Sequence, residues 1–268
     1  MCRLLAYVAP APRNASEVLG PEQLERFAKL AELHSHGWGA AWVERPGAPV
    51  GHHREIADLR AGGAFDVLTQ EQPAVAMGLH LRLASSGAVV PANSHPFTHA
   101  GISLMHNGTI APRDRLDALL EPATLAAMTS TTDSERYLGL VADHRGAAAD
   151  LGAAAASAVG VLRAAHPTAS LNAVMIDEAE MVVVHASSSS PDPLEELLAE
   201  SGTADLPEGH ETGYYQMYWR TEADGTVLIA SSGLDTAGWT TLPHDSITIF
   251  DLTTGHMSLR RIPVGGTA

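Results

Sequence analysis

Short apolar runs alternate with amphipathic stretches along the chain, and this pattern predicts a mixture of strands and helices. Apolar runs bounded by glycine or polar turn residues predict strands. The predicted strands are residues 2–8, 39–43, 74–83, 102–105, 172–176, 181–185, 214–219, 227–230, 246–250 and 256–261. Helices are predicted at residues 21–33, 133–140, 147–165 and 194–198. Many strands beside few helices, with sequence neighbours expected to pair, favour α+β layers over a doubly wound parallel sheet.

The domain organisation is predicted from the lack of breaks in this pattern. No internal repeat recurs at a period of about 20–50 residues, and no linker-like segment divides the chain. The serine- and proline-rich run at 187–193 predicts a surface loop before a short helix. We therefore expect a single domain over residues 1–268, and its 45% hydrophobic content suffices for a packed core.

The charge balance is acidic, because 31 acidic and 16 basic side chains give a formal net charge of −15. Nucleic acids and anionic membranes bind basic surfaces, so neither is expected as a partner. The single cysteine excludes an intramolecular disulfide. No run reaches the roughly 18 uncharged apolar residues of a membrane-spanning helix, and the first residues make a poor signal peptide. A cytoplasmic protein is the expectation.

The only cysteine, Cys2, directly follows Met1. A small second residue permits removal of the methionine, which would leave Cys2 with a free α-amine. The ordinary pKa of such an amine is about 7.7–8.0, so it can take the thiol proton near neutral pH. One residue would then supply both nucleophile and base. Most lone cysteines are instead small buried apolar residues, so the position alone does not establish this role.

Three further motifs carry candidate chemistry. Arg82 ends a predicted strand, where its guanidinium can bind a carboxylate through two parallel hydrogen bonds, and Ser85 offers a hydroxyl in the following loop. Asn107 and Gly108 offer a side-chain amide and an unhindered N–H as a plausible oxyanion hole. Asp133 opens a predicted helix, where its carboxylate could bind an ammonium group. Singly, such motifs are mostly turns and helix caps.

In this order after Cys2, the motifs together resemble the class II glutamine amidotransferases, a branch of the N-terminal-nucleophile hydrolases. The likeness runs from Cys2 to about Glu135 and includes the Gly-x-Gly strand start at 37–39. It implies a four-layer αββα sandwich with two antiparallel sheets between helical layers. It also implies the site roles: Cys2 as nucleophile, Arg82 and Ser85 holding the glutamyl α-carboxylate, Asn107 and Gly108 as oxyanion hole, and Asp133 binding the α-amine.

The sequence departs from the family pattern in the loop after Arg82. Leu83 and Ser86 stand where the domains of sugar-phosphate and purine pathways commonly carry an aromatic residue and a histidine. Residues 230–243 resemble stand-alone members instead, such as the γ-glutamyl hydrolase of ergothioneine biosynthesis. The expected function is cleavage of a γ-glutamyl amide, in glutamine or a conjugate, through a glutamyl-thioester and without a cofactor. The length is about that of one such domain, so ammonia would pass to a separate synthase subunit, or water would complete the reaction.

Two other functional classes stay open. The histidine pairs at 34–36 and 52–53 invite a zinc hydrolase, although no His-Glu-x-x-His or Cys-x-x-Cys motif accompanies them. The fold could also serve as a catalytically silent binding subunit, a reading that a retained Met1 would favour because it blocks the amine. The tyrosine-rich segment 213–219 is either a half-buried strand or an aromatic wall that faces substrate.

Overall fold

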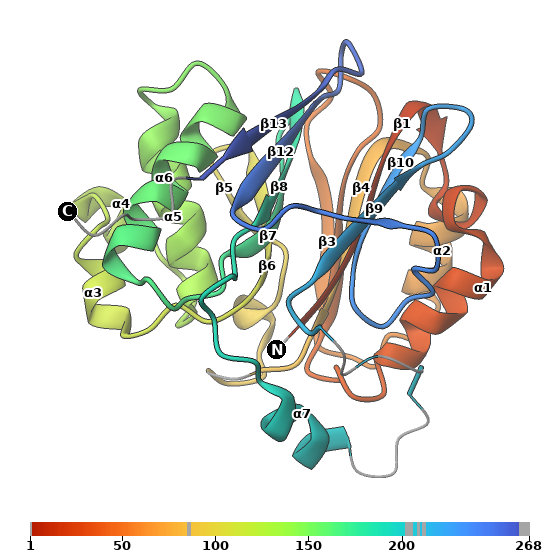
Figure 1. The fold of residues 1–268 in the computed structure, drawn as a ribbon, viewed down its shortest axis with the longest axis horizontal. Helices are drawn as coiled ribbons and strands as arrows, with labels where there is room; N and C mark the ends of the chain where they lie inside the picture. The colour runs from red at the N-terminus through yellow and green to blue at the C-terminus, as the bar shows by residue number, and fades with distance from the viewer. Residues whose placement is uncertain (1, 85–86, 202–205, 208–209, 211–212, 263–268) are drawn as a thin grey trace.

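The computed structural model describes residues 2–84, 87–201, 206–207, 210 and 213–262. Two antiparallel sheets face each other, and helices cover both outer sides (Figure 1). The layers confirm the predicted four-layer αββα sandwich. Among the described residues, no helix has the length and apolar character needed to cross a membrane.

The seven-stranded sheet has the order β11-β9-β10-β1-β4-β2-β3, and the six-stranded sheet has the order β13-β12-β8-β7-β6-β5. The first comprises β1 (Cys2–Arg13), β2 (Trp38–Val43), β3 (Gly51–Glu55), β4 (Ala74–Arg82), β9 (Met217–Thr221), β10 (Val227–Ser231) and β11 (Thr240–Thr241). The second comprises β5 (Phe97–His99), β6 (Ile102–Asn107), β7 (Asn172–Ile176), β8 (Glu180–His185), β12 (Ser246–Asp251) and β13 (Met257–Arg261).

Helices pack on the outer face of each sheet (Figure 1). The seven-stranded sheet is covered by α1 (Ala15–Leu30) and α2 (Ala64–Glu71). The six-stranded sheet is covered by α5 (Asp133–Arg145) and α6 (Leu151–Ala165), while α3 (Arg113–Asp117) packs against both of these helices and α4 (Pro122–Ala126) packs against α5. A further helix, α7 (Leu194–Ser201), lies near the N-terminal end of β1 in the view of Figure 1.

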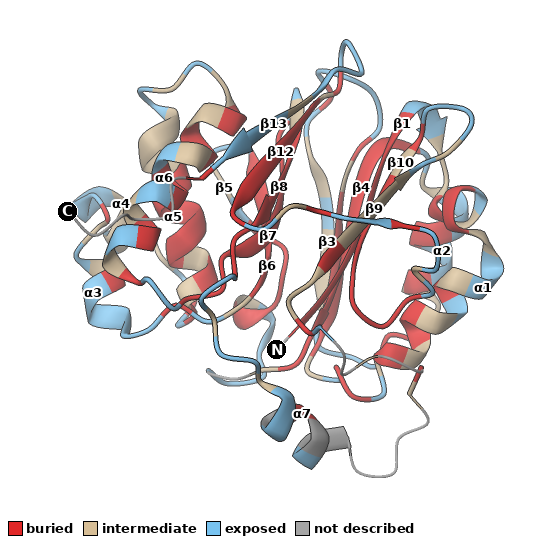
Figure 2. Ribbon diagram, viewed as in Figure 1, coloured by how far each residue is buried: buried red, intermediate tan, exposed pale blue. Residues whose placement is uncertain are grey.

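Burial on both faces explains why β1 appears in the sequence as a continuous apolar run. Successive strand residues point to opposite faces. Leu5 and Tyr7 therefore pack against the α1–α2 layer, whereas Leu4 and Ala6 pack between the sheets. Figure 2 shows the same distribution across the molecule, with buried residues on the strands and on the helix faces that meet them.

Strand register places three chemically active side chains together. β1 pairs with β4 so that Cys2 lies opposite Arg82 and Leu4 lies opposite His80. Residues directly opposite share a face, and residues two apart on one strand do so as well. The side chains of Cys2, His80 and Arg82 therefore project from one end of this sheet into the space between the two sheets.

Several predicted bounds and elements were wrong. The first helix begins at Ala15 rather than residue 21, because Asn14 and Glu17 form a capping box and Gly20, at a φ of 75°, joins two helical segments. The strand predicted from residue 214 begins at Met217. Polar β3 was not predicted, because as an edge strand with the sequence GHHRE it lacks apolar alternation. The other elements missed were α2, β5, α3, α4 and β11.

Candidate active site

Cys2 is held by hydrogen bonds on both sides of its backbone. Its N–H donates to Asn107 Oδ1 over 3.1 Å. Its carbonyl oxygen accepts from Arg3 Nη1 at 3.1 Å and from the Tyr214 hydroxyl at 3.2 Å. The Arg3 guanidinium also stacks over the Tyr214 ring at 4.3 Å. These contacts fix the Cys2 backbone, and the residue is only 6% exposed.

The thiol opens into a small pocket where most of the predicted site residues meet. Its lining includes Cys2, Arg82, Gly108 and Asp133 together with Leu83, Ala84, His95, His106, Thr132 and Ser134. Asn107 is linked to the pocket through its hydrogen bond to Cys2. Ser85, the remaining predicted residue, lies outside the described residues. Larger cavities, of about 810 Å³ between α1 and α2 and about 410 Å³ beside Ser103, lie away from the only cysteine.

The geometry around Asn107 and Gly108 fits a site that stabilises negative charge. Asn107 is fully buried, and its Nδ2 has no hydrogen-bond acceptor among the described residues. A buried donor of this kind is costly unless something pairs with it. Its backbone is also held, since Ser170 Oγ donates to the Asn107 carbonyl at 2.9 Å. A Cβ on Gly108 would overlap the Ser170 carbonyl oxygen, so only glycine fits there.

The electrostatics of the pocket favour a thiolate. Burial by itself raises the pKa of the Cys2 thiol, but the positive charges of His80 and of the chain N-terminus oppose it. Hydrogen bonds from His80 and from the Leu83 backbone act in the same direction, and together these effects lower the pKa from 9.0 to about 6. At neutral pH the sulfur is therefore mostly ionised, which is the nucleophilic form.

Arg82 supplies a positive charge beside the thiol. Its side chain is buried, and burial lowers the pKa of its guanidinium while the nearby Cys2 and Asp133 groups raise it. Its backbone is fixed by the segment that precedes β2: the Arg82 N–H donates to the Gly37 carbonyl at 2.8 Å. Gly37 has a φ of 125°, a conformation that favours glycine. A Cβ on Gly39 would overlap the His95 carbonyl oxygen, so this glycine lets the loop that carries His95 approach the site.

Asp133 supplies the negative charge and is fixed at the start of α5. Its Oδ2 accepts from the Ile110 N–H at 2.6 Å, and its Oδ1 accepts from the Ser134 N–H at 3.0 Å. A carboxylate has about four acceptor positions, so it can accept further hydrogen bonds from a ligand. Thr132 caps the helix by accepting from the Glu135 N–H.

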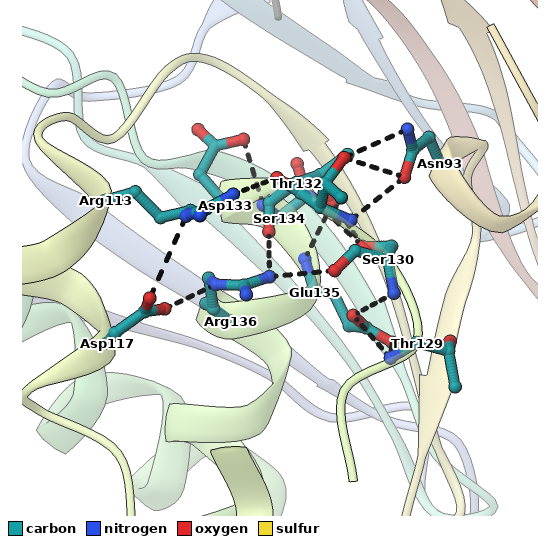
Figure 3. A network of polar contacts seen from close by, with 11 residues as sticks. Asn93, Arg113, Asp117, Thr129, Ser130, Thr132, Asp133, Ser134, Glu135 and Arg136 are labelled. Carbon is teal, nitrogen blue, oxygen red and sulfur yellow. Dashed lines mark hydrogen bonds and ion pairs between the residues drawn. The ribbon is translucent and has the colours of Figure 1, made fainter. Parts of the chain in front are cut away.

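The segment around Asp133 is held by a dense polar network (Figure 3). The Glu135 carboxylate accepts from the Thr129 and Ser130 N–H groups at 3.0 and 2.7 Å. Arg136 pairs with Asp117 at 2.5 Å and donates to the carbonyl oxygens of Ser130 and Thr132. These hydrogen bonds hold the loop before α5 in place. They therefore help to fix the position at which the Asp133 carboxylate can meet a charge on a ligand.

Five residues near the thiol were not predicted from the sequence as site residues. These are Arg3, His80, His95, His106 and Tyr214. The period of two along β4 could have indicated His80, since it shares a face with Arg82. Arg3 directly follows Cys2, but nothing in the sequence shows that its side chain turns back to the Cys2 carbonyl. No local signal marks His95, His106 or Tyr214, because their relation to Cys2 depends on contacts between distant segments. Tyr214 lies before β9 and not within a strand, and its hydroxyl donates to the Cys2 carbonyl. Its contact is therefore with the backbone of the candidate nucleophile.

Of the histidine pairs considered for zinc, the first contacts backbone groups and one member of the second lies near a carboxylate. His34 Nδ1 lies 2.8 Å from the Leu30 carbonyl, and His36 Nδ1 accepts from the Ala84 N–H at 2.9 Å. His53 lies 3.8 Å from a Glu55 carboxylate oxygen. Within the described ranges, no group of three or more histidine, cysteine or acidic side chains is arranged to hold a metal ion.

Replacing Arg3 with methionine should destabilise the fold by about 1–3 kcal/mol. The variant removes a charged donor from the buried Cys2 carbonyl and the cation from the face of Tyr214. Urea unfolding measures the loss, with Arg115→Met, which removes a bond on the exposed surface, as the control. Equal stability of the two variants would contradict a structural role for Arg3 at Cys2.

Comparison with known proteins identifies the family. Residues 1–255 match the model of the class-II glutamine amidotransferases. The chain therefore belongs to this family. It is 31% identical over 199 residues to glutamine–fructose-6-phosphate aminotransferase (isomerizing) of Streptomyces coelicolor. That match covers 71% of the chain but only 29% of the length of this relative.

Solved structures share the fold at low sequence identity. A glutamine aminotransferase class-II domain protein from Silicibacter pomeroyi superimposes with a TM-score of 0.63 at 18% identity, covering 98% of this chain and 100% of that one. Glutamine phosphoribosylpyrophosphate amidotransferase from B. subtilis gives 0.65 at 16% identity, covering 98% of this chain and 50% of that one. These likenesses confirm the amidotransferase architecture.

Proposed function

We propose that the protein cleaves the γ-amide bond of glutamine or of a γ-glutamyl conjugate, with Cys2 as nucleophile. The observation that carries this proposal is the bond between the Cys2 N–H and Asn107 Oδ1, which places beside a thiol of lowered pKa an amide whose Nδ2 has no acceptor among the described residues. A nucleophile beside a positioned donor is the arrangement needed for acyl transfer. Family membership supports the same chemistry.

The proposed reaction proceeds in two steps. The Cys2 thiolate attacks the γ-carbonyl carbon and forms a tetrahedral intermediate, whose oxyanion accepts hydrogen bonds from Asn107 Nδ2 and the Gly108 N–H. The nitrogen takes up the proton that the thiol released, the carbon–nitrogen bond breaks, the amine leaves, and a glutamyl-thioester remains. Water attacks the thioester, which releases glutamate and restores the thiolate. Ammonia from glutamine would serve a separate synthase subunit, whereas a conjugate would yield a free amine as product.

The two charged groups in the pocket match the glutamyl end of such a substrate. We propose that Arg82 holds the α-carboxylate, with Ser85 as an additional hydroxyl, and that Asp133 holds the α-ammonium group. The pocket contains both Arg82 and Asp133 beside Cys2, which supports this assignment. Two opposite charges fixed in one pocket can orient a zwitterion and so place its far carbonyl at the nucleophile.

Blocking either α-group of a good substrate should lower kcat/KM by more than about tenfold. Blocking one α-group leaves the charged side chain that would bind it without a partner. This costs about 2–5 kcal/mol in transition-state binding. The measurement compares glutamine with its Nα-acetyl and α-methyl ester derivatives, and changes beyond the γ-nitrogen serve as the tolerated control. If both blocked compounds kept kcat/KM within about tenfold, the γ-glutamyl assignment would fail and only a thiol hydrolase would remain.

Activity should fall as the pH drops through about 6. The pKa of the Cys2 thiol is lowered to about 6, so the sulfur holds its proton below this value and loses it above. kcat/KM measured against pH should therefore show an acid limb with a midpoint near 6. An acid limb near the ordinary thiol pKa would mean that the free enzyme does not hold a thiolate at neutral pH.

A chromatographic screen of γ-glutamyl amides, with glutamine included, identifies the substrate. Release of glutamate from one or more of them, absent in a Cys2→Ala variant, is the expected result. No turnover by the freshly purified protein across the screen would favour the silent binding subunit.

A further inference from the structure

We propose that Ser170 is a positioning residue of the oxyanion hole. Its hydroxyl holds the peptide group between Asn107 and Gly108, so that the Gly108 N–H is aimed into the pocket beside Cys2. The effect on catalysis rests on the proposed function, but the orientation of the peptide group does not. Ser170 lies between α6 and β7, more than sixty residues from Asn107 along the chain, and it was not among the predicted site residues.

The geometry of the peptide group gives Ser170 this influence. A trans peptide unit is planar, and its C=O and N–H point in opposite directions. The bond between Asn107 and Gly108 is trans. Ser170 Oγ donates to the Asn107 carbonyl at 2.9 Å, so the Gly108 N–H is turned away from Ser170. Gly108 lines the pocket that contains Cys2, and an N–H with this orientation can face it.

The glycine makes a restraint of this kind necessary. Glycine has no Cβ, so the peptide group that precedes it meets little resistance to rotation. No other residue fits at position 108, because a Cβ there would overlap the Ser170 carbonyl oxygen. The close approach of Ser170 therefore requires the glycine, and the Ser170 hydroxyl in turn limits the rotation that the glycine would allow.

Ser170 is itself held by a buried chain of hydrogen bonds. Its carbonyl oxygen lies 2.9 Å from His106 Nε2, and His106 Nδ1 lies 3.0 Å from Ser134 Oγ. A carbonyl only accepts, so Nε2 carries the hydrogen and Nδ1 accepts from the Ser134 hydroxyl. The next residue, Leu171, donates its N–H to the Ala186 carbonyl at 2.9 Å. Because Ser134, His106 and Ser170 are all buried, water does not compete for these bonds.

The two donors of the oxyanion hole are thus fixed by separate contacts. Asn107 Oδ1 accepts from the Cys2 N–H at 3.1 Å, which fixes the side-chain amide. Ser170 fixes the backbone amide that follows. Donors stabilise an oxyanion most when they are aimed before the reaction begins. Loss of the Ser170 contact alone should therefore slow the reaction.

Replacing Ser170 with alanine should lower kcat by about 10–100-fold with little change in KM, less than the loss of a whole oxyanion donor. The variant keeps the Gly108 N–H but releases the peptide group that aims it. The donor acts on the oxyanion rather than on the bound amide, so the loss falls on kcat. Steady-state kinetics with the best substrate of the amide screen measures both constants.

Ser246→Ala is the matched control. Ser246 is also buried, and its hydroxyl donates to a backbone carbonyl, that of Pro243 at 2.6 Å. It lies on β12, which β8 and β7 separate from β6 in the same sheet. Both variants lose a buried hydroxyl, but only Ser170→Ala should lose kcat. Equal kcat in the two variants would overturn the proposal.

The aldehyde analogue of glutamine separates positioning from a general loss of stability. The Cys2 thiolate adds to the aldehyde carbon, and the carbonyl electron pair moves to oxygen, which gives the same oxyanion as the tetrahedral intermediate. Its affinity should fall in Ser170→Ala by the factor by which kcat falls. A fall in kcat with unchanged affinity for the aldehyde would contradict the proposal.

Nuclear magnetic resonance tests the orientation without any substrate. In the unmodified protein, the Asn107 carbonyl carbon should show the downfield shift of a hydrogen-bonded carbonyl, and the Gly108 amide should give one sharp signal. In Ser170→Ala the carbonyl shift should decrease, and the Gly108 signal should broaden or double. A doubled Gly108 signal in the unmodified protein would refute the restraint even if the variant does not fold. No turnover in the amide screen, together with a single Gly108 signal and a hydrogen-bonded Asn107 carbonyl, would reject the proposed function and leave the orientation by Ser170 supported.

Discussion

Replacing Cys2 with alanine is expected to abolish turnover of every γ-glutamyl amide while leaving the fold intact. The thiolate is the only strong nucleophile in the chain, and no other cysteine can substitute for it. The change removes a single sulfur atom from a buried side chain, and the backbone bonds from Asn107, Arg3 and Tyr214 remain available. Turnover is measured by release of glutamate, and folding by circular dichroism and thermal unfolding.

Labelling of the nucleophile provides the positive control. A glutamine-analogue electrophile should add its mass only to the peptide that contains Cys2, and should not modify the alanine variant. Cys2→Ser places a hydroxyl where the thiol was. This variant should also be inactive, since the pKa of a hydroxyl is far higher than that of a thiol. Activity in the alanine variant would refute the mechanism. Loss of activity with chelators and its recovery with zinc would instead support the histidine-dependent hydrolase.

Replacing Asn107 with alanine is expected to lower kcat by about 10²–10³ with little change in KM. The variant removes the Nδ2 donor that has no other acceptor among the described residues and that lies beside the thiol. A donor that acts on the oxyanion lowers the energy of the transition state more than that of the bound substrate, so the loss falls on kcat. Steady-state kinetics with the best substrate of the amide screen measures both constants.

Asn172 offers a matched control for this variant. It lies opposite Asn107 in the β6–β7 pair, and both polar atoms of its amide have partners: Nδ2 donates to the Tyr215 carbonyl and Oδ1 accepts from the Ala186 N–H. Asn172→Ala should therefore lower stability more than it lowers kcat. A change in KM alone for Asn107→Ala would identify Asn107 as a binding or turn residue.

Much of the fold could be predicted because burial imposes simple patterns. β1 and β4 are buried on both faces, and helix α6 is marked by its apolar run, so each appears directly in the sequence. The missed elements lack such patterns. β3 is a polar edge strand, and α3 and α4 have only five residues each, too few for a helical period to emerge.

The sequence by itself was enough to predict the reactive group and its general surroundings. A lone Cys2, followed by Arg82, Asn107-Gly108 and Asp133 in order, was enough to indicate the family and its sandwich fold. Residue identity carries this information because each step of the proposed chemistry needs a particular side chain. The structure brings Cys2, Arg82, Gly108 and Asp133 into one pocket, with Asn107 bonded to Cys2.

Only the tertiary structure decided how the thiol is held and ionised. The Tyr214 contact to the Cys2 carbonyl joins segments 212 residues apart, and the position of His80 depends on the β1–β4 register. A shift of one residue in that register would turn His80 to the opposite face. The pKa of the thiol depends on burial and on charges a few ångströms away, and these are properties of packed neighbours that no local pattern in the chain contains.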